Sequence, residues 1–85
     1  MPSISTFFNI KIFMNWNEHR PPHFHAKYSE YEASFDLDGN VLKGYLPLKQ
    51  KRLVLAWLEV HKEEIYKNWN LAENKEELCK IEPLK

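Results

Sequence analysis

The sequence contains one cysteine, two glycines and no net charge, and each of these shortages excludes a class of protein. Because Cys79 has no second cysteine to pair with, it forms no internal disulfide, which favours a reducing compartment. Twelve basic residues are balanced by twelve acidic ones, so the overall charge does not indicate a nucleic-acid partner. No apolar run reaches the roughly 18–20 residues of a membrane span, and the N-terminus lacks a signal-peptide pattern. We therefore expect a cytoplasmic protein that does not associate with membranes.

Aromatic residues, by contrast, are plentiful. The chain has five Phe, four Tyr and three Trp among 85 residues. Each of these rings can bury roughly 150–250 Å², enough to build a dense core in a small protein. The scarcity of glycine and proline argues against disorder or low complexity. We expect a single domain over residues 1–85.

Hydrophobic residues alternate with polar ones in the first half of the chain, a pattern typical of strands with one buried face. The alternation predicts four strands, at residues 7–16, 23–28, 31–37 and 41–46. Asp38-Gly39 suits the positive φ angles of a tight hairpin turn. Residues 1–46 are therefore expected to form an antiparallel meander in which the strands lie in sequence order.

The period of the pattern becomes helical after Pro47, a residue favoured at the first position of a helix. A helix is predicted from about residue 48 to 72, within the segment 47–73, with a left-handed cap at Asn74. Residues 74–85 are expected to form a tail that packs through Leu78 and Ile81.

The expected fold class is α+β, a small four-stranded antiparallel meander with one long C-terminal helix packed on one face. Trp57 should be buried where the helix meets the sheet. The sheet residues predicted to face the helix are Ile10, Phe24, Phe35 and Leu42.

Two-residue turns at 29–30 and 38–39 would fix the register of the three later strands. His23 then lies opposite Asp36. His25 lies opposite Ser34, and Ser34 lies opposite Lys43. The side chains that this register places on the outer face of the sheet are Lys11, His23, His25, Lys27, Glu32, Ser34, Asp36, Lys43 and Tyr45.

The outer face combines imidazoles with a carboxylate. A carboxylate beside a histidine fixes its tautomer and raises its pKa, and such a histidine is suited to act as a general acid or base. The candidate catalytic residues are His23, His25 and Asp36. The candidate substrate-binding residues, which would hold a phosphate, are Arg20, Lys27, Lys43, Lys49 and Arg52. The alternative is a solvated polar face, as antiparallel sheets often have, with the cations at the helix start screened by solvent.

The remaining histidines bear on metal binding. His61 lies in the apolar stripe of the helix, where a hydrogen-bonded core residue is expected. His19 precedes Pro21-Pro22 and, with His23 and His25, could supply three ligands to zinc. However, no cysteine joins them, and neither Cys-x-x-Cys nor His-Glu-x-x-His is present. We expect no metal site and no cofactor, and the aromatic core should fold without metal.

Five stretches carry a resemblance to a known family: MPSISTFF, HRPPHFHAKYSEYEA, GYLP, LVLAWLEVHKEEIYKNW and KIEPL. Together they resemble the bacterial family labelled domain of unknown function 4160 over nearly the whole chain. Members of that family often carry glycine where this chain has Asn9, so a bend in the first strand would be made differently here. The resemblance also implies a neighbouring gene for a second small protein, of the 2442 family, and hence a two-gene module.

Two-gene modules of small bacterial proteins are often toxin–antitoxin systems, whose toxins commonly cleave RNA. One hypothesis is therefore a toxin-like endoribonuclease that uses the histidines of the outer face on RNA. A second hypothesis is a non-catalytic module whose exposed aromatics and sheet edges dock a small acidic partner protein. A third is a histidine-rich metal-binding protein. The chain would act as a monomer or a homodimer.

Overall fold

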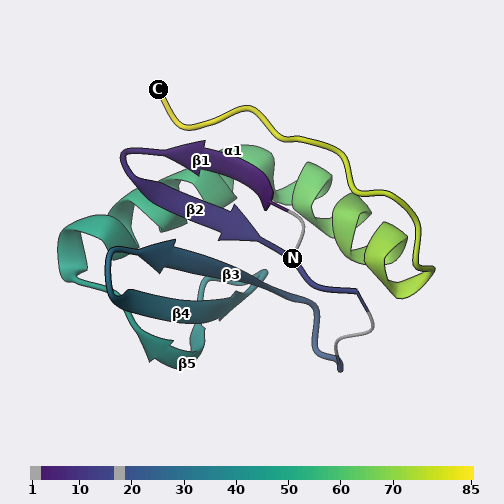
Figure 1. Ribbon diagram of the computed structural model, residues 1–85, viewed down its shortest axis with the longest axis horizontal. Helices are drawn as coiled ribbons and strands as arrows, with labels where there is room; N and C mark the ends of the chain where they lie inside the picture. The colour runs from purple at the N-terminus through teal and green to yellow at the C-terminus, as the bar shows by residue number, and fades with distance from the viewer. Residues whose placement is uncertain (1–2, 17–18) are drawn as a thin grey trace.

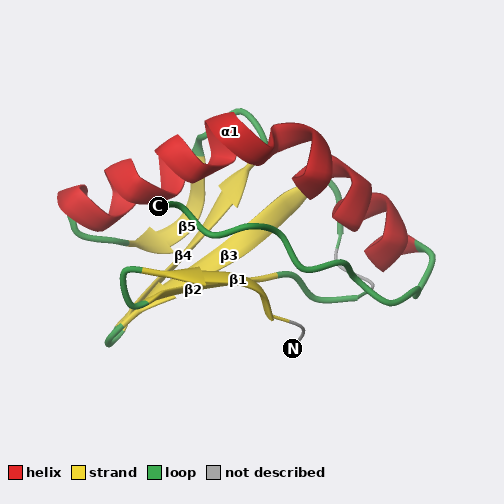
Figure 2. Ribbon diagram, turned by 90° about the horizontal axis from the view of Figure 1, so that it is seen from above, coloured by secondary structure: helices red, strands yellow, loops and turns green. Residues whose placement is uncertain are grey.

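The computed structural model describes residues 3–16 and 19–85. Within these ranges five strands form one antiparallel sheet in the order β1-β2-β3-β4-β5, and α1 lies along one face of it (Figures 1 and 2). The elements are β1 (Ser3–Phe7), β2 (Ile10–Phe13), β3 (His23–Tyr28), β4 (Tyr31–Asp36), β5 (Val41–Tyr45) and α1 (Leu48–Glu73). The predicted α+β class with one long C-terminal helix is confirmed, whereas the predicted number of strands is wrong.

The additional strand is β1, which lies almost wholly before the strand predicted at residues 7–16. That predicted strand contains the turn and β2. The chain turns back at Phe8 and Asn9, whose φ angles are 48° and 63°. Two consecutive positive φ angles are typical of a two-residue hairpin turn, for which the usual sequence signal is glycine. Asn9 adopts the left-handed conformation without a glycine, because asparagine tolerates it better than most residues. The turn of this hairpin therefore lies inside the segment that the hydrophobic pattern assigns to one strand.

The predicted register of the later strands is confirmed. The Cα partners of β3 and β4 run from Tyr28 opposite Tyr31 to His23 opposite Asp36. Between β4 and β5, Ser34 lies opposite Lys43, as the turn at residues 38–39 predicts. For β3 and β4 the agreement arises because the hairpin has a tight turn and one apolar face, and a slip of one residue would expose that whole face. In β5 every residue is exposed, and Phe35 lies opposite Val41 instead of Leu42.

Leu42 departs from the prediction. Its side chain is 46% exposed and does not join the core, because the register of β4 and β5 shifts between Ser34 and Phe35. Such an irregularity places an extra residue in one strand and turns side chains away from their expected face.

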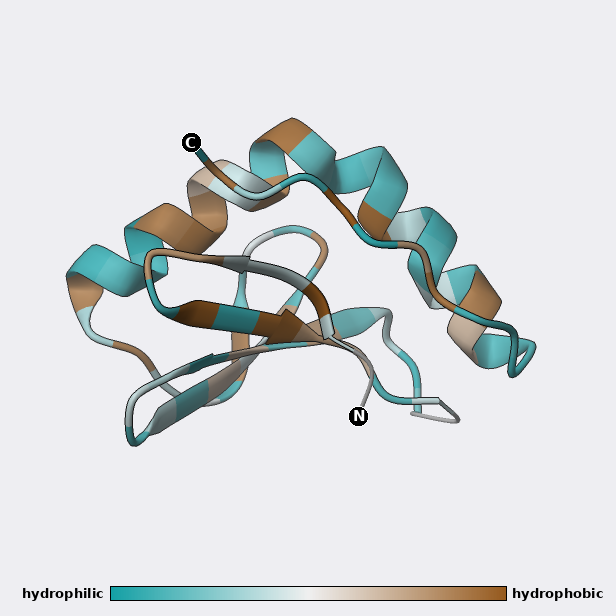
Figure 3. Ribbon diagram, turned by 45° about the horizontal axis from the view of Figure 1, so that its top comes forward, coloured by the Kyte–Doolittle hydropathy of each residue, from teal (hydrophilic) through white to brown (hydrophobic). Residues whose placement is uncertain are grey.

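The core lies between α1 and the sheet. Trp57 is fully buried, as predicted, and its ring packs 5.7 Å from the rings of both Phe7 and Phe24. Hydrophobic bands alternate with hydrophilic ones along α1, as an amphipathic helix requires (Figure 3). In the described ranges no helix combines the length and apolar character that crossing a membrane requires.

The ends and the middle of α1 add three details. The helix begins at Leu48, as predicted, and ends at Glu73. Asn74 has a φ of −91°, so the predicted left-handed cap is wrong there, and Lys75 (φ 59°) takes the left-handed conformation instead. The helix is also kinked at His61, whose φ and ψ of −116° and 20° are not helical.

Residues 74–85, which we call the C-terminal segment, run back alongside α1 toward β1 (Figures 1 and 2). The backbone N–H of Ile81 donates a hydrogen bond to the carbonyl oxygen of Ile4 in β1, at 2.8 Å. The Asn68 side chain makes two further hydrogen bonds with the backbone of Cys79. Ile81 is buried, and Leu78 packs against the core. The C-terminal segment therefore covers the β1 edge of the sheet.

Candidate functional site

The sheet face opposite α1 carries two cross-strand rows of side chains, because the registers of β2 to β5 are aligned. In the described ranges no helix covers this face, which we call the open face (Figure 2). One row consists of Phe13, His25, Ser34 and Lys43. The Cα partners of the other row are Lys11, Lys27, Glu32 and Tyr45, although the Tyr45 ring packs on Tyr31 instead of on this face.

The two candidate catalytic histidines pack against aromatic rings. The His25 ring stacks on Phe13, with centroids 5.0 Å apart and an interplanar angle of 14°. The His23 ring lies 5.2 Å from His25 and 5.2 Å from Trp69 of α1. The 2.8 Å distance from His23 Nδ1 to the carbonyl oxygen of Pro21 fits an Nδ1–H that donates to it. Both imidazoles are thus half-buried parts of the packing rather than freely exposed side chains.

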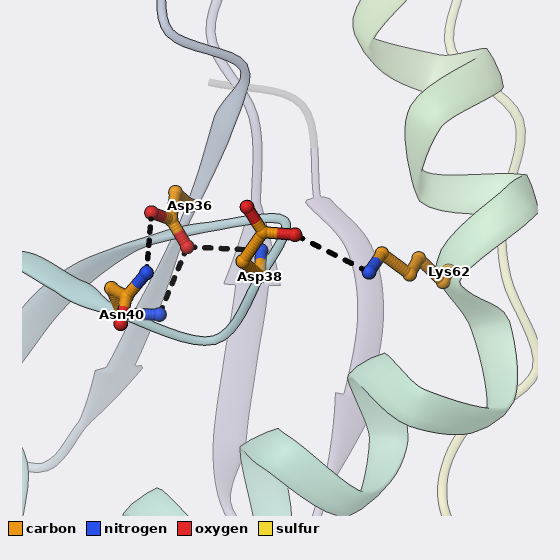
Figure 4. Close-up of polar contacts among 4 residues, drawn as sticks. All are labelled: Asp36, Asp38, Asn40 and Lys62. Carbon is orange, nitrogen blue, oxygen red and sulfur yellow. Dashed lines mark hydrogen bonds and ion pairs between the residues drawn. The ribbon is translucent and has the colours of Figure 1, made fainter.

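The carboxylate of Asp36 serves the turn between β4 and β5 (Figure 4). It accepts hydrogen bonds from the backbone N–H groups of Asp38 and Asn40, both at 2.9 Å, and from the side-chain amide of Asn40 at 3.0 Å. Burial by itself would raise the pKa of Asp36, but the hydrogen bonds from residues 38–40 outweigh it and hold the pKa below its ordinary value. Asp36 lies opposite His23 as predicted, yet its oxygens are engaged with the turn.

The candidate substrate-binding residues do not gather in one place. Lys27 and Lys43 lie on the open face. Arg20 donates to the carboxylate of Glu73 at 3.0 Å. Lys49 and Arg52 are exposed in the first turns of α1, beyond the end of β5. The structure therefore separates the predicted cations into three groups.

Tyr45 does not contribute its ring to the open face, contrary to the prediction. It lies opposite Glu32, but the ring packs edge-on against Tyr31 at 5.7 Å, and Tyr31 packs against the core. The cause is Gly44, which has a φ of +83°. A Cβ atom on Gly44 would lie 2.1 Å from the carbonyl oxygen of Glu32, so only glycine fits this irregular strand.

His61 occupies the kink of α1 and is half-buried. Its Nδ1 lies 2.6 Å from the Glu64 carboxylate, and its ring centroid is 5.9 Å from that of Trp57. Its side chain is 12% exposed. This is the hydrogen-bonded helix histidine that the sequence predicts, placed at the margin of the core. Among the described residues there is no group of three or more His, Cys, Asp or Glu side chains that could hold a metal ion.

A feature that sequence analysis missed lies along the outer edge of β5. A groove of about 320 Å³, which we call the β5 groove, opens between this strand and the start of α1. It is lined by Val41, Gly44, Tyr45, Leu46, Leu48 and Lys51. Three of its apolar side chains are exposed, by 38% at Val41, 63% at Tyr45 and 59% at Leu48. The sequence signal for it is the run of large apolar residues that continues past the strand into the helix.

Comparison with known families identifies one match. A family model described as "Domain of unknown function (DUF4160)" matches residues 9–70, which include β2 to β5 and most of α1. Neither a curated protein nor a solved structure is similar enough to this chain to match it.

Proposed function

The chain belongs to the DUF4160 family, and we propose that it is a protein-binding module that adds an extended, acidic segment of a partner protein to the edge of β5. The observation that carries this proposal is the unpaired β5 edge beside the β5 groove. Pairing of a peptide with a sheet edge is a common recognition mode: backbone hydrogen bonds give affinity, and pockets for alternate side chains give specificity.

The two edges of the sheet differ. At β1, the C-terminal segment donates a backbone hydrogen bond to Ile4 and covers the strand. At β5, no described strand pairs with the outer side, and all five residues are exposed. Proteins usually protect a sheet edge, because its free N–H and C=O groups pair readily with another chain. An open edge next to exposed apolar side chains is what a docking site for a strand requires.

The β5 groove would hold the apolar side chains of the bound segment. Val41, Tyr45 and Leu48 are large and exposed, and they line one continuous groove at the edge. Because successive side chains of a strand point to opposite faces, a bound strand would place every second residue in the groove. The remaining side chains would lie on the other side of the edge, near Lys43.

The charge around the edge favours an acidic partner. Four cations surround it, and none forms an ion pair with a described residue; they are Lys43, Lys49, Lys51 and Arg52. The first turn of α1 contains no acidic residue, so the positive end of the helix dipole is uncompensated as well. A second copy of this chain would bring the same cations to the interface, and their repulsion argues against it.

The toxin-like hypothesis stays a prediction. It assigns acid–base roles to His23, His25 and Asp36, but the Asp36 oxygens hold the turn at residues 38–40. The protein-binding hypothesis is the better supported of the two because the β5 edge needs no rearrangement. A small acidic protein encoded by a neighbouring gene is the first partner to test.

The proposal can be tested with two synthetic ten-residue peptides. Both carry valine at alternating positions; one has glutamate and the other has lysine between them. The glutamate peptide should shift the backbone amide resonances of residues 41–45, and its binding affinity should fall as salt is raised. The lysine peptide should not bind. Leu48→Asn, which removes an apolar side chain of the β5 groove without adding charge, should reduce the affinity at least tenfold. Val60→Asn, at an exposed apolar position elsewhere on α1, should leave it unchanged. Equal binding of both peptides, or amide shifts away from β5, would contradict the proposal.

A further inference from the structure

The open face places two lysines directly opposite each other. Lys11 of β2 and Lys27 of β3 are Cα partners, and both are exposed. Like charges at directly opposed positions of an antiparallel pair destabilise it. Neither lysine forms an ion pair with a described residue. Lys11 Nζ lies 6.0 Å from the centre of the Phe13 ring, a weaker partner than a carboxylate. On its other side Lys27 lies opposite Glu32 of β4, so this part of the row carries two lysines and one carboxylate and keeps a net positive charge.

A third lysine borders a hollow on the same face. A cavity of about 250 Å³ is lined by His25, Glu32, Ala33, Ser34, Lys43 and Gly44. Ser34 and Lys43 are Cα partners, so a hydroxyl and an ammonium group come from adjacent strands. The absent side chain of Gly44 helps to keep the hollow open, since a Cβ atom there would lie 2.1 Å from the Glu32 carbonyl oxygen.

We propose that the open face binds phosphate groups, held by Lys11, Lys27 and Lys43. The hollow beside His25 and Ser34 would receive phosphate oxygens. Lysine binds phosphate as a flexible point charge, and serine supplies a hydroxyl donor.

The charge balance of the face fits this ligand. Along the two rows, three lysines and the Glu32 carboxylate give a net charge of +2 (three minus one). Asp36 lies beyond these rows, opposite His23, and is engaged with the turn at residues 38–40. A phosphate monoester carries about −1.5 to −2 at pH 7, and two phosphodiesters carry about −2 together. A single carboxylate ligand would leave one positive charge uncompensated. The hollow and the β5 groove share Gly44, and Lys43 lies near both, but their other lining residues differ, and Lys11 and Lys27 belong to the open face alone.

The bound phosphate group could come from a small phosphate-containing molecule or from the backbone of a single-stranded RNA. The following experiment distinguishes these two ligands. The isotopically labelled protein is titrated at low salt with inorganic phosphate and, separately, with an eight-nucleotide uridine RNA. Either ligand should shift the amide resonances of Lys11, Lys27 and Lys43. An RNA affinity at least tenfold above that of phosphate would assign the site to an RNA backbone. Equal affinities would assign it to a free phosphate group.

The matched variants are Lys11→Gln combined with Lys27→Gln, and Lys67→Gln on α1 as the control. The double variant should lose at least tenfold in affinity for phosphate, while Lys67→Gln should bind like the wild type. If RNA binds, the double variant should also lower the slope of log affinity against log salt by about 1.4, since each phosphate contact on a single strand contributes about 0.7.

A stability measurement guards against loss of fold. Without ligand, the double variant should melt at or above the temperature of the wild type, because the substitution removes the opposed charges. Added phosphate should raise the melting temperature of the wild type and leave that of the double variant unchanged. The proposal is overturned if neither ligand shifts the open-face amides, or if the folded double variant binds as tightly as the wild type.

Discussion

Replacing Asn68 with alanine should loosen the C-terminal segment from α1. Asn68 is 1% exposed, and its side chain makes two hydrogen bonds with the backbone of Cys79. The amide Nδ2 donates to the Cys79 carbonyl oxygen at 2.8 Å, and Oδ1 accepts from the Cys79 N–H at 2.9 Å. An asparagine side chain that satisfies both groups of one residue acts as a two-point clamp on the chain.

The expected cost follows from these two contacts. Each hydrogen bond contributes about 1 kcal/mol net, and Cys79 is exposed enough for water to replace the lost partners. The free energy of unfolding should therefore fall by about 2 kcal/mol. For a domain of this size that corresponds to a decrease of about 8–16 °C in Tm. Hydrogen exchange should also accelerate at the Cys79 and Ile81 amides, because Ile81 depends on the same segment for its bond to Ile4.

Two further variants make the test specific. Asn68→Asp keeps an acceptor but turns a carboxylate oxygen toward the Cys79 carbonyl, so it should destabilise at least as much as Asn68→Ala. Asn70→Ala, at an exposed position of the same helix, should cost less than about 0.5 kcal/mol. If Asn68→Ala melts like Asn70→Ala and the exchange rates stay the same, the clamp does not hold the segment.

Four other predictions concern the core, strand β5, the turn held by Asp36 and the candidate catalytic residues. Trp57→Ala should lower the free energy of unfolding by roughly 3–5 kcal/mol in a denaturant melt, since a fully buried aromatic ring is lost; a loss under about 1 kcal/mol would show that the core is misplaced. Gly44→Ala should cost at least about 2 kcal/mol, because its φ of +83° and the adjacent backbone leave no room for a Cβ atom. Because the pKa of Asp36 is lowered in the folded protein, its carboxylate stabilises the fold at pH values above the ordinary pKa of 3.8, and this contribution is lost as the pH falls through the lowered pKa. Asp36→Asn should therefore flatten the acid side of the curve of unfolding free energy against pH. If the toxin-like hypothesis is correct, His23→Ala and His25→Ala should abolish RNA cleavage in a gel assay while the protein stays folded, and wild-type protein without cleavage activity would rule that hypothesis out.

The later strands were predictable because their signals are local. The alternation in residues 23–28 and 31–37, with a tight turn between them, admits one register that buries the apolar face. The same reasoning failed at Phe8 and Asn9, because a turn without glycine or proline leaves the hydrophobic alternation unbroken. The strand at Ser3–Phe7 was therefore missed, because the turn that separates it from β2 lies within the residues predicted as one strand.

The candidate site was harder to predict because it depends on the hydrogen bonds and directions of side chains, which the strand register does not determine. The register predicts the position of Asp36 opposite His23, but it does not predict that the turn engages the carboxylate. The signal for that contact is Asp-x-Asp-Gly-Asn, a pattern in which aspartate often bonds to the following backbone. The β5 groove depends on the irregular backbone at Gly44, which redirects Tyr45 away from the open face. An alternation pattern contains no information on such a change of direction.

Besides its apolar side chains, hydrogen bonds to its main chain hold the C-terminal segment. Trp16 Nε1 donates to the Glu76 carbonyl oxygen and Trp57 Nε1 to that of Glu82, both at 3.0 Å, and Asn68 binds the backbone of Cys79. These contacts would form with almost any residue at positions 76, 79 and 82. The selective constraint on this stretch therefore falls on its apolar anchors and on the tryptophan and asparagine donors elsewhere in the chain. Substitutions at the outward positions should accumulate freely among relatives, and a fluorophore attached to Cys79 should report on the segment without displacing it.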